Sequence, residues 1–235
     1  QQIPPASSEK PYFTLTKHVV GLTEDDLQLL SGKLTFTVQK SNNSSFTNPE
    51  TVMTYTATNL GSWTPNGDGS WTLSARISMK DQAPGYYYRI EESGAELDGF
   101  NLTATDTNAA VLLQSTTVAG FTFTNTYADT GRALKLTKIV NAPDTTGSFT
   151  FTVSYTDAGG KTQTQSVTLK NSQSNTITGI PRGAQVTVTE TTTDGYTVIM
   201  RDHSTGTVLA GSSSYTFTMK DDTAVDIYNT STVAL

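Results

Sequence analysis

The stretch Val186-Thr-Val-Thr-Glu190-Thr-Thr-Thr-Asp-Gly195-Tyr196 alternates between apolar and polar residues until a glutamate takes the next apolar position. Side chains of a β-strand point alternately to its two faces, so Val186, Val188 and Glu190 share the face that turns toward the core. A lone carboxylate in a protein core costs several kcal/mol. The stretch therefore predicts a half-buried strand whose glutamate has either a buried partner or a chemical role.

No window of the 235-residue chain shows a sustained period of 3.6 residues, which favours β-structure throughout. Threonine makes up roughly a fifth of the sequence and aromatic residues are spread evenly, a composition typical of β-strands. An exception is the short segment Leu22–Leu30, where we expect one or two helical turns. A chain of this length holds one large or two ordinary domains, and two all-β domains of about 115 residues fit best.

Composition also argues against several kinds of site and partner. The chain has no cysteine, so it has no disulfide, no thiolate metal site and no cysteine nucleophile. Its net charge is −6 and its Lys and Arg residues are scattered, which argues against a nucleic-acid partner. The longest apolar run, Ala109–Leu113, is too short to span a bilayer, and Gln1 opens no signal-peptide pattern. We expect a mature, soluble chain or a trimmed piece of one.

The two halves of the chain carry the same landmarks in the same order, as in a repeated domain. The first landmark is an alternating strand whose inward row ends in a lysine: Phe13-Thr-Leu-Thr-Lys17-His-Val in one half and Leu134-Lys-Leu-Thr-Lys138-Ile-Val in the other. Lys135 has the opposite parity and is expected in solvent. Two half-buried strands, Leu34–Val38 and Phe149–Val153, are expected to follow the first strand across the sheet.

The second landmark is the inward glutamate. Tyr86-Tyr-Tyr-Arg-Ile-Glu-Glu92 in the first half matches Ala184-Gln-Val-Thr-Val-Thr-Glu190 in the second. Parity selects Glu92, which shares a row with Tyr88 and Ile90, and leaves Glu91 in solvent. The first half is therefore expected to bury a glutamate in the same way as the second.

The third landmark is an inward asparagine on the last strand of each half. Phe121-Thr-Phe-Thr-Asn125 corresponds to Val225-Asp-Ile-Tyr-Asn229, and both asparagines continue the apolar row. Each half thus combines an inward lysine on its first strand, an inward glutamate in the middle and an inward asparagine at the end.

Between the halves, Thr126-Tyr-Ala-Asp-Thr-Gly-Arg-Ala133 is short and polar and is interpreted as the linker. The boundary near Asp129 gives an N-terminal domain of residues 1–128 and a C-terminal domain of residues 129–235. The segment around Pro4 and Pro5 is expected to be a flexible leader, and Ser231–Leu235 is interpreted as a clipped tail. Asn66-Gly-Asp-Gly69, between two tryptophans, predicts a hairpin turn.

A lysine, a glutamate and an asparagine enclosed in one water-free core can form an amide bond. The lysine amine attacks the carbonyl carbon of the asparagine side chain, and ammonia leaves. Burial favours the neutral amine, which is the nucleophile, and the neutral carboxylic acid, which polarises the carbonyl and carries protons. The candidate cross-links are Lys17–Asn125 and Lys138–Asn229, with Glu92 and Glu190 as the catalytic residues of a single-turnover isopeptide formation.

These motifs resemble a family of Gram-positive surface proteins. Val188-Thr-Glu190-Thr followed by Gly195-Tyr196 is similar to the E-box of collagen-adhesin B-type (CnaB) domains. Pro84–Glu92 resembles the corresponding strand of T-antigen-type streptococcal major pilins. The resemblance covers both halves and includes the Leu-Thr-Lys first strand and the Asn-Thr last strand. It implies two tandem immunoglobulin-like (CnaB-type) β-sandwiches, each with adjacent, parallel first and last strands joined by an isopeptide bond.

The function implied by this resemblance is structural: an extracellular pilin or cell-wall stalk subunit on a bacterial surface, rather than a turnover enzyme. Its partners would be other pilin subunits or the cell wall, joined by a sortase. The chain has neither a Leu-Pro-x-Thr-Gly sorting signal nor a Tyr-Pro-Lys pilin motif. No cofactor, metal ion or nucleic acid is expected to bind.

Other interpretations stay open from the sequence. Each Lys–Glu pair could be a partly exposed ion pair beside an unrelated Asn-Thr turn. Trp63, Trp71 and the tyrosines at 86–88 could form the platform of an adhesin tip that binds a host glycan or matrix protein, although aromatic residues commonly pack within hairpins. A hydrolase would need a nucleophile and a cleft that the sequence does not present. His18 and His203 are expected to be solvated rather than to bind metal.

Overall fold

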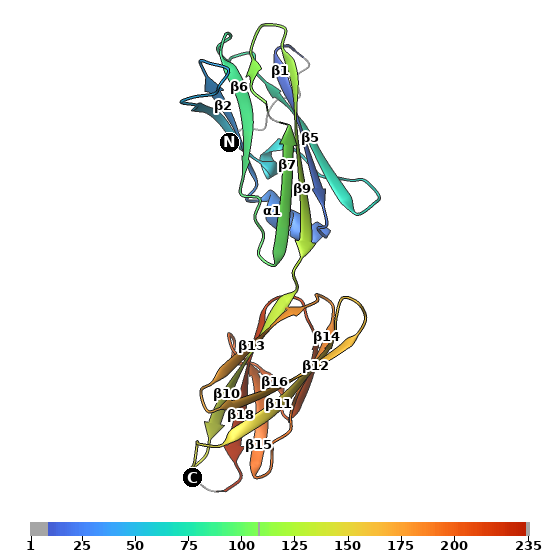
Figure 1. Ribbon diagram of the computed structural model, residues 1–235, viewed down its shortest axis with the longest axis vertical. Helices are drawn as coiled ribbons and strands as arrows, with labels where there is room; N and C mark the ends of the chain where they lie inside the picture. Colours follow the sequence, from blue (N-terminus) through green and yellow to red (C-terminus); the bar gives the residue numbers. More distant parts are fainter. Residues whose placement is uncertain (1–8, 108, 234–235) are drawn as a thin grey trace. The chain divides into compact units, whose positions relative to one another are not determined.

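The computed structural model describes residues 9–107 and 109–233, so the flexible start predicted around Pro4 and Pro5 lies outside the described residues. The chain divides into two compact units, Gln1–Asp129 and Thr130–Leu235 (Figure 1). Both units are built almost entirely of β-strands, which confirms the predicted all-β fold of two tandem sandwiches. Neither helix in the described part of the chain is long and apolar enough to cross a membrane.

The first domain is a sandwich of two sheets. One sheet has the strand order β4-β5-β1-β9-β7, and the other has the order β3-β2-β6-β8. The elements are β1 (Tyr12–Val20), α1 (Glu24–Ser31), β2 (Thr35–Ser41), β3 (Glu50–Thr56), α2 (Ala57–Leu60), β4 (Thr64–Pro65), β5 (Ser70–Ser78), β6 (Tyr87–Ser93), β7 (Phe100–Thr107), β8 (Val111–Leu112) and β9 (Val118–Asp129).

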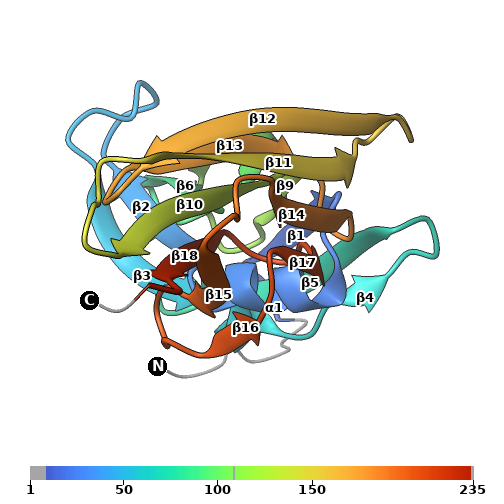
Figure 2. The ribbon, with the colours of Figure 1, turned by 90° about the horizontal axis from the view of Figure 1, so that it is seen from below.

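The second domain repeats this plan with the orders β13-β10-β18-β15-β16 and β12-β11-β14-β17. Figure 2 shows β11 and β12 in one layer and β18 and β15 in the other. The strands are β10 (Arg132–Asn141), β11 (Ser148–Thr156), β12 (Thr162–Lys170), β13 (Ser174–Ile180), β14 (Gln185–Glu190), β15 (Tyr196–Asp202), β16 (Val208–Ala210), β17 (Ser214–Thr218) and β18 (Thr223–Ser231).

The first and last strands of each domain are parallel neighbours, as expected. Strand β1 pairs with β9, and strand β10 pairs with β18. Adjacent strands of a sheet lie about 4.8 Å apart, so inward side chains from the two ends of each domain meet in the core. This pairing is what can bring the lysine and the asparagine of each half together.

The prediction that the second strand follows the first across the same sheet was wrong in both domains. Strands β2 and β11 lie in the opposite sheet, where they pair with β6 and β14. In the first domain, helix α1 separates β1 from β2 along the chain. In the first domain, the apolar row of β2 then faces the sheet of β1 and β9 across the core, where the centroids of the Phe36 and Phe123 rings lie 5.3 Å apart. A hydrophobic row must face another apolar layer, and alternation alone does not say which layer it joins.

The linker is shorter than the predicted segment of Thr126–Ala133. Strand β9 continues to Asp129 and β10 begins at Arg132, which leaves Thr130 and Gly131 between them. Tyr127 is buried and extends the inward row of β9, and Arg132 is buried and begins the inward row of β10. Gly131 has a φ of 81°, and a Cβ there would lie 2.7 Å from the Gly179 carbonyl carbon, so this position requires glycine.

The short helix and the hairpin predicted in the first half are both present. Helix α1 begins after Thr23, whose side-chain oxygen accepts a hydrogen bond from the Asp26 amide and caps the helix. Its buried Leu27 and Leu30 pack into the core. The turn of residues 66–69 joins β4 to β5, where Pro65 pairs with Trp71. Both features are set by local sequence signals.

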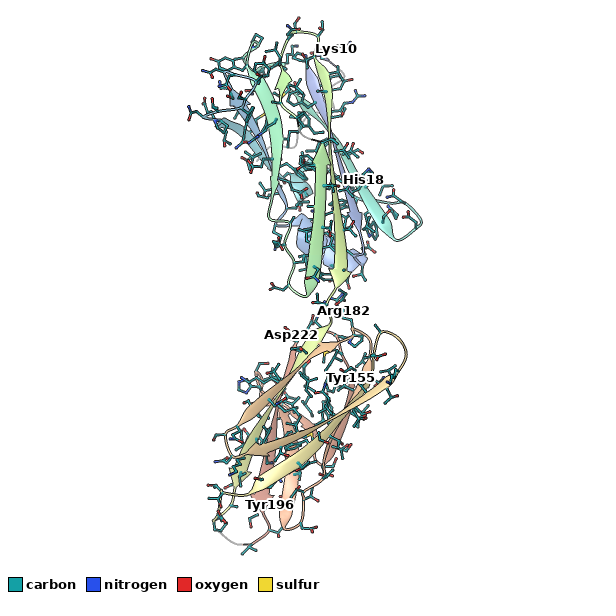
Figure 3. All side chains as sticks on the ribbon, in the orientation of Figure 1. Lys10, His18, Tyr155, Arg182, Tyr196 and Asp222 are labelled. Carbon is teal, nitrogen blue, oxygen red and sulfur yellow. The ribbon has the colours of Figure 1, made fainter. Side chains whose placement is uncertain are left out.

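Apolar side chains fill the space between the two sheets of each domain (Figure 3). A few charged or amide side chains interrupt these cores, and four of them have no exposed surface: Lys17, Asn125, Lys138 and Asn229. Buried ionisable groups are rare unless they are paired or have a function. These residues define the candidate site.

Candidate functional site

In the second domain, Lys138 and Asn229 lie on neighbouring parallel strands. Lys138 of β10 pairs with Ile227 of β18, and Val140 pairs with Asn229, so the asparagine lies two residues beyond the point opposite the lysine. The lysine side chain spans this offset, because Lys138 Nζ donates hydrogen bonds to Asn229 Oδ1 and, over 3.1 Å, to the Ile227 carbonyl oxygen. The amine thus contacts the carboxamide group that it would attack.

Glu190 reaches the same two groups from the opposite sheet. Strand β14 places it opposite Phe151 of β11. Asn229 Nδ2 donates to Glu190 Oε1 over 2.5 Å, and Lys138 Nζ lies 3.7 Å from that oxygen. The lysine and glutamate side chains are both 0% exposed. The interpretation of this pair as a partly exposed ion pair is therefore wrong.

Burial shifts both ionisable groups of this triad toward their neutral forms. Desolvation lowers the pKa of Lys138 to about 8, although the nearby Glu190 carboxylate opposes the shift. Desolvation also raises the pKa of Glu190, against the opposing effect of Lys138. The rings of Phe149 and Phe151 lie 4.6 and 5.7 Å from Lys138 Nζ and help to exclude water. A neutral amine and a neutral acid are the forms that amide formation needs.

The first domain repeats this geometry on different strands. Lys17 of β1 pairs with Phe123 of β9, and Val19 pairs with Asn125, which is the same two-residue offset. Glu92 of β6 lies opposite Phe36 of β2, as Glu190 lies opposite Phe151 in the second domain. The three predicted residues of each half are therefore brought together by equivalent strands.

The contacts in the first triad differ in detail from those in the second. Lys17 Nζ lies 2.9 Å from Glu92 Oε2, a charge contact without hydrogen-bond alignment, and Asn125 Nδ2 donates to Glu92 Oε1 over 2.8 Å. The Glu92 side chain is 10% exposed. Burial lowers the pKa of Lys17, with Glu92 opposing the shift. Asn125 Oδ1 is buried and makes no hydrogen bond within the described part of the chain.

The structure also corrects and extends the sequence prediction. The inward rows do not end at the lysines, because Val19 and Val140 beyond them are buried as well. Glu91 is exposed, as parity predicted.

Sequence reasoning missed Tyr127, whose hydroxyl accepts a hydrogen bond from Asn125 Nδ2 at 3.4 Å and donates one to the Ala95 carbonyl oxygen at 2.7 Å. Burial raises the pKa of Tyr127 to about 12. The sequence could have indicated Tyr127, because it follows Asn125 by two residues and therefore points to the same face of β9.

Most of the aromatic residues proposed as a binding platform pack within the first domain, whereas Tyr86 is exposed. Trp63 Nε1 donates to Ser31 Oγ over 3.1 Å, and Trp71 Nε1 donates to the Leu22 carbonyl oxygen over 3.1 Å. Both rings pack against the core, where they hold the ends of helix α1. Tyr88 is fully buried. These contacts favour packing over ligand binding for the tryptophans.

The two histidines lie in different domains. His18 Nδ1 is 3.0 Å from Thr72 Oγ1, and His203 Nδ1 is 3.0 Å from both carboxylate oxygens of Asp226. The His203 side chain is 62% exposed. Each histidine thus has a local polar partner.

The lowered pKa of Lys138 predicts a pH-dependent stability when the amide cannot form. In an Asn229→Ala variant, the folded state releases the Lys138 proton near pH 8, whereas the unfolded state releases it near the ordinary value of 10.5. Between these values the unfolded chain binds more protons, so the free energy of unfolding of the second domain rises with pH. Hydrogen exchange of peptides from β10 and β18 measures this change.

The matched control for this prediction is Asn229→Ala combined with Lys138→Met, which should not show the rise. A chain with an intact Lys138–Asn229 amide should not show it either, because an amide does not titrate in this range. The raised pKa of Glu190 acts in the opposite direction, since stability from that group is lost as pH rises through its folded pKa. An equal rise in the double variant would contradict the assignment to Lys138.

Comparisons with known proteins give one sequence match and several similar folds. Residues 134–232 match the model of a domain of unknown function, DUF5979. No curated protein sequence matches the chain. Structural similarity to two major pilins of Streptococcus pyogenes extends over nearly the whole chain. The T-13 pilin is 15% identical, with 95% of this chain and 98% of that chain covered and a TM-score of 0.34. Another is 18% identical, with 93% and 97% covered and a TM-score of 0.35.

A pilus-presented adhesin, Cpa, is also similar in structure. It is 16% identical, with 65% of this chain covered and a TM-score of 0.38. The chain spans 39% of the length of that adhesin.

Proposed function

We propose that this chain is a structural subunit of an extracellular fibre, a pilin or cell-wall stalk of a Gram-positive bacterium, in which each domain cross-links itself once. The cross-links are amides between Lys17 and Asn125 and between Lys138 and Asn229. The observation that carries the proposal is the buried contact of the Lys138 amine with the Asn229 carboxamide. The Glu190 carboxyl group lies against both of these groups. The same three residue types recur at equivalent positions in the first domain.

The proposed reaction uses only groups that lie in the core. Neutral Lys138 Nζ attacks Asn229 Cγ, while the protonated carboxyl of Glu190 donates to the carboxamide and activates it. The Cγ–Nδ2 bond then breaks, and Glu190 passes a proton from the lysine nitrogen to the leaving nitrogen. Ammonia departs and an amide remains. Fixed proximity drives the step, because well-oriented intramolecular reactions reach effective molarities of ~10⁵ M or more.

The position of the bonds supports a mechanical role. Each amide would join the first strand of a domain to its last strand, which are parallel neighbours. Tension applied through these two strands would pass through the covalent bond and bypass the remaining strands of the sandwich. A fibre subunit gains resistance to force from such a bond in every domain, whereas a binding module does not need a cross-link in both of its domains.

The motifs shared with CnaB-type domains support a location on the cell wall or pilus surface. On this proposal, the partners are other pilin subunits or the cell wall, joined through a sortase. The reaction is completed once per molecule, so the chain is not a turnover enzyme.

Intact mass tests the proposal most directly. Each amide formed from lysine and asparagine expels one ammonia, so the folded chain should weigh about 17 Da less per bond and about 34 Da less for both. Electrospray mass spectrometry of the denatured protein measures this difference. Lys17→Met and Lys138→Met should each recover one ammonia after correction for the substitution. A mass equal to the value calculated from the sequence would refute the proposal.

A further inference from the structure

A cavity of about 320 Å³ opens beside the triad of the first domain. It lies between β6 of one sheet and β7 and β9 of the other. Its lining combines the buried Asn125 and the nearly buried Glu92 with exposed residues, among them Glu91, Ala104 and Asp106. The cavity therefore leads from the surface of the domain to Glu92, and Asn125, which has no exposed surface, lies directly behind its wall.

The cavity has a structural cause in the length of one strand. In the first domain, β8 pairs with β6 only at Tyr87 and Tyr88 among the described residues. In the second domain, β17 pairs with β14 from Gln185 to Thr189, and Glu190 N donates to the Ser213 carbonyl oxygen. The covering strand thus reaches the glutamate in the second domain. This difference agrees with side-chain exposures of 10% for Glu92 and 0% for Glu190.

We propose that this cavity is a binding site for ammonia and small primary amines, which reach the side-chain carbonyl of Asn125 behind its wall when side chains of the lining move. The inference rests on the proposed isopeptide chemistry and adds a second use of the same site. In the native reaction the cavity is the exit of the ammonia that Lys17 displaces. When the lysine amine is absent, a small amine from solution takes its place.

Three features of the cavity favour this class of ligand. Asn125 Oδ1 is buried without a hydrogen bond in the described structure, so an amine N–H that reaches it finds a vacant acceptor. The exposed carboxylates of Glu91 and Asp106 attract ammonium ions to the opening, although Arg89 also lines it. The volume exceeds the roughly 30 Å³ that one water molecule occupies in the liquid, so methylamine fits.

The exchange reaction balances without any other reactant. The nitrogen of the incoming neutral amine bonds to Asn125 Cγ, and the Cγ–Nδ2 bond breaks. Glu92 takes a proton from the amine nitrogen and gives one to Nδ2, which leaves as ammonia. The product is an N-alkylated asparagine side chain, and the glutamate returns to its initial state.

Methylamine is the probe that tests this site. The Lys17→Met variant keeps most of the buried volume of the lysine chain but removes the nucleophile. After incubation with methylamine at mildly alkaline pH, its mass should increase by about 14 Da, the difference between the amine gained and the ammonia lost. Peptide mapping should place the change at Asn125. The matched variant Lys138→Met, whose triad is closed, should not change under the same conditions.

Two second-site changes separate the proposed chemistry from nonspecific labelling. Adding Glu92→Gln to Lys17→Met should lower the rate of incorporation by ~10²-fold or more, because the proton carrier is lost. Adding Ala104→Phe should block the opening and also lower the rate. Lys17→Ala serves as an independent background if Lys17→Met folds poorly. Folding is checked by near-UV circular dichroism, because Trp63 and Trp71 both lie in the first domain.

The outcomes distinguish this inference from the proposed function. Equal labelling of the Lys17 and Lys138 variants would overturn the cavity as the route of entry. No labelling of folded Lys17 variants would overturn the amine site, while a wild-type mass deficit of about 34 Da would still support the isopeptide bonds. A wild-type chain without that deficit would instead remove the proposed function itself.

Discussion

When the wild-type chain is pulled from end to end, neither domain should show an unfolding step, whereas each of two lysine variants should release one long extension. Lys17→Met should free the chain between residues 17 and 125, and Lys138→Met should free the chain between residues 138 and 229, which are 91 positions apart. At ~3.4 Å per residue, the two steps should be on the order of 350 Å and 300 Å. Single-molecule force spectroscopy measures these lengths.

The physical reason is the place of each bond in its domain. Lys17 and Lys138 lie on the first strands, and Asn125 and Asn229 lie on the last strands, so the proposed bonds would enclose nearly all of each domain in a covalent loop. Force that enters through these strands would be carried by the amide, so the chain between the linked lysine and asparagine would not be stretched. Only the short segments outside the two loops can lengthen in the wild type.

Each single variant is the internal control for the other, because its second, cross-linked domain should give no unfolding step. The step lengths identify which domain has opened. Ordinary unfolding of both wild-type domains, in a protein whose mass deficit is confirmed, would show that the bonds join other residues. The stalk function would then lose its main support.

The second large effect is expected when the proposed catalytic acids, Glu92 and Glu190, are replaced. Glu190→Gln keeps the shape of the side chain and its contact with Asn229 but removes the acidic proton. Without the acid the carboxamide is poorly activated, so this variant should fold and regain about 17 Da. Glu92→Gln should do the same for the first domain. Intact mass and thermal unfolding are measured on the same preparations.

Loss of a bond should also lower stability. By the loop-closure estimate used for disulfides, a covalent loop of this size contributes about 4–5 kcal/mol to the free energy of unfolding. For a domain of this size, that loss lowers the melting temperature on the order of 20 °C. The uncross-linked domain should therefore melt well before its cross-linked neighbour.

Glu91→Gln is the matched control, because Glu91 is adjacent to Glu92 but exposed. It should keep the full mass deficit and the wild-type melting profile. Complete cross-linking in Glu92→Gln or Glu190→Gln would show that the glutamate is not the acid in that domain. Tyr127, which contacts Asn125 Nδ2, would then be the next residue to replace in the first domain.

Much of the fold could be read from alternation because each strand has one buried face. The parity of the Val186, Val188 and Glu190 row is a local property of an extended chain, and so is the choice of Glu92 over Glu91. Helix α1 could be predicted for the same reason, since its cap and its apolar spacing lie within a few residues. The linker is shorter than its polar composition predicts, because Tyr127 still belongs to the inward row of β9 and Arg132 already belongs to that of β10.

The sequence alone determined which side chains face inward, that each half has a lysine, a glutamate and an asparagine among them, and that the three occur in the same order twice. These are properties of one strand at a time. The folded arrangement of the strands was needed to show that β2 and β11 cross to the opposite sheet and that the glutamates reach the lysine–asparagine pairs from there. It also decided that the first triad opens to a cavity while the second is closed, because the coverage of β6 and β14 depends on the lengths of β8 and β17. Alternation fixes the face of a strand but not its neighbours, since pairing depends on contacts between segments far apart in the chain.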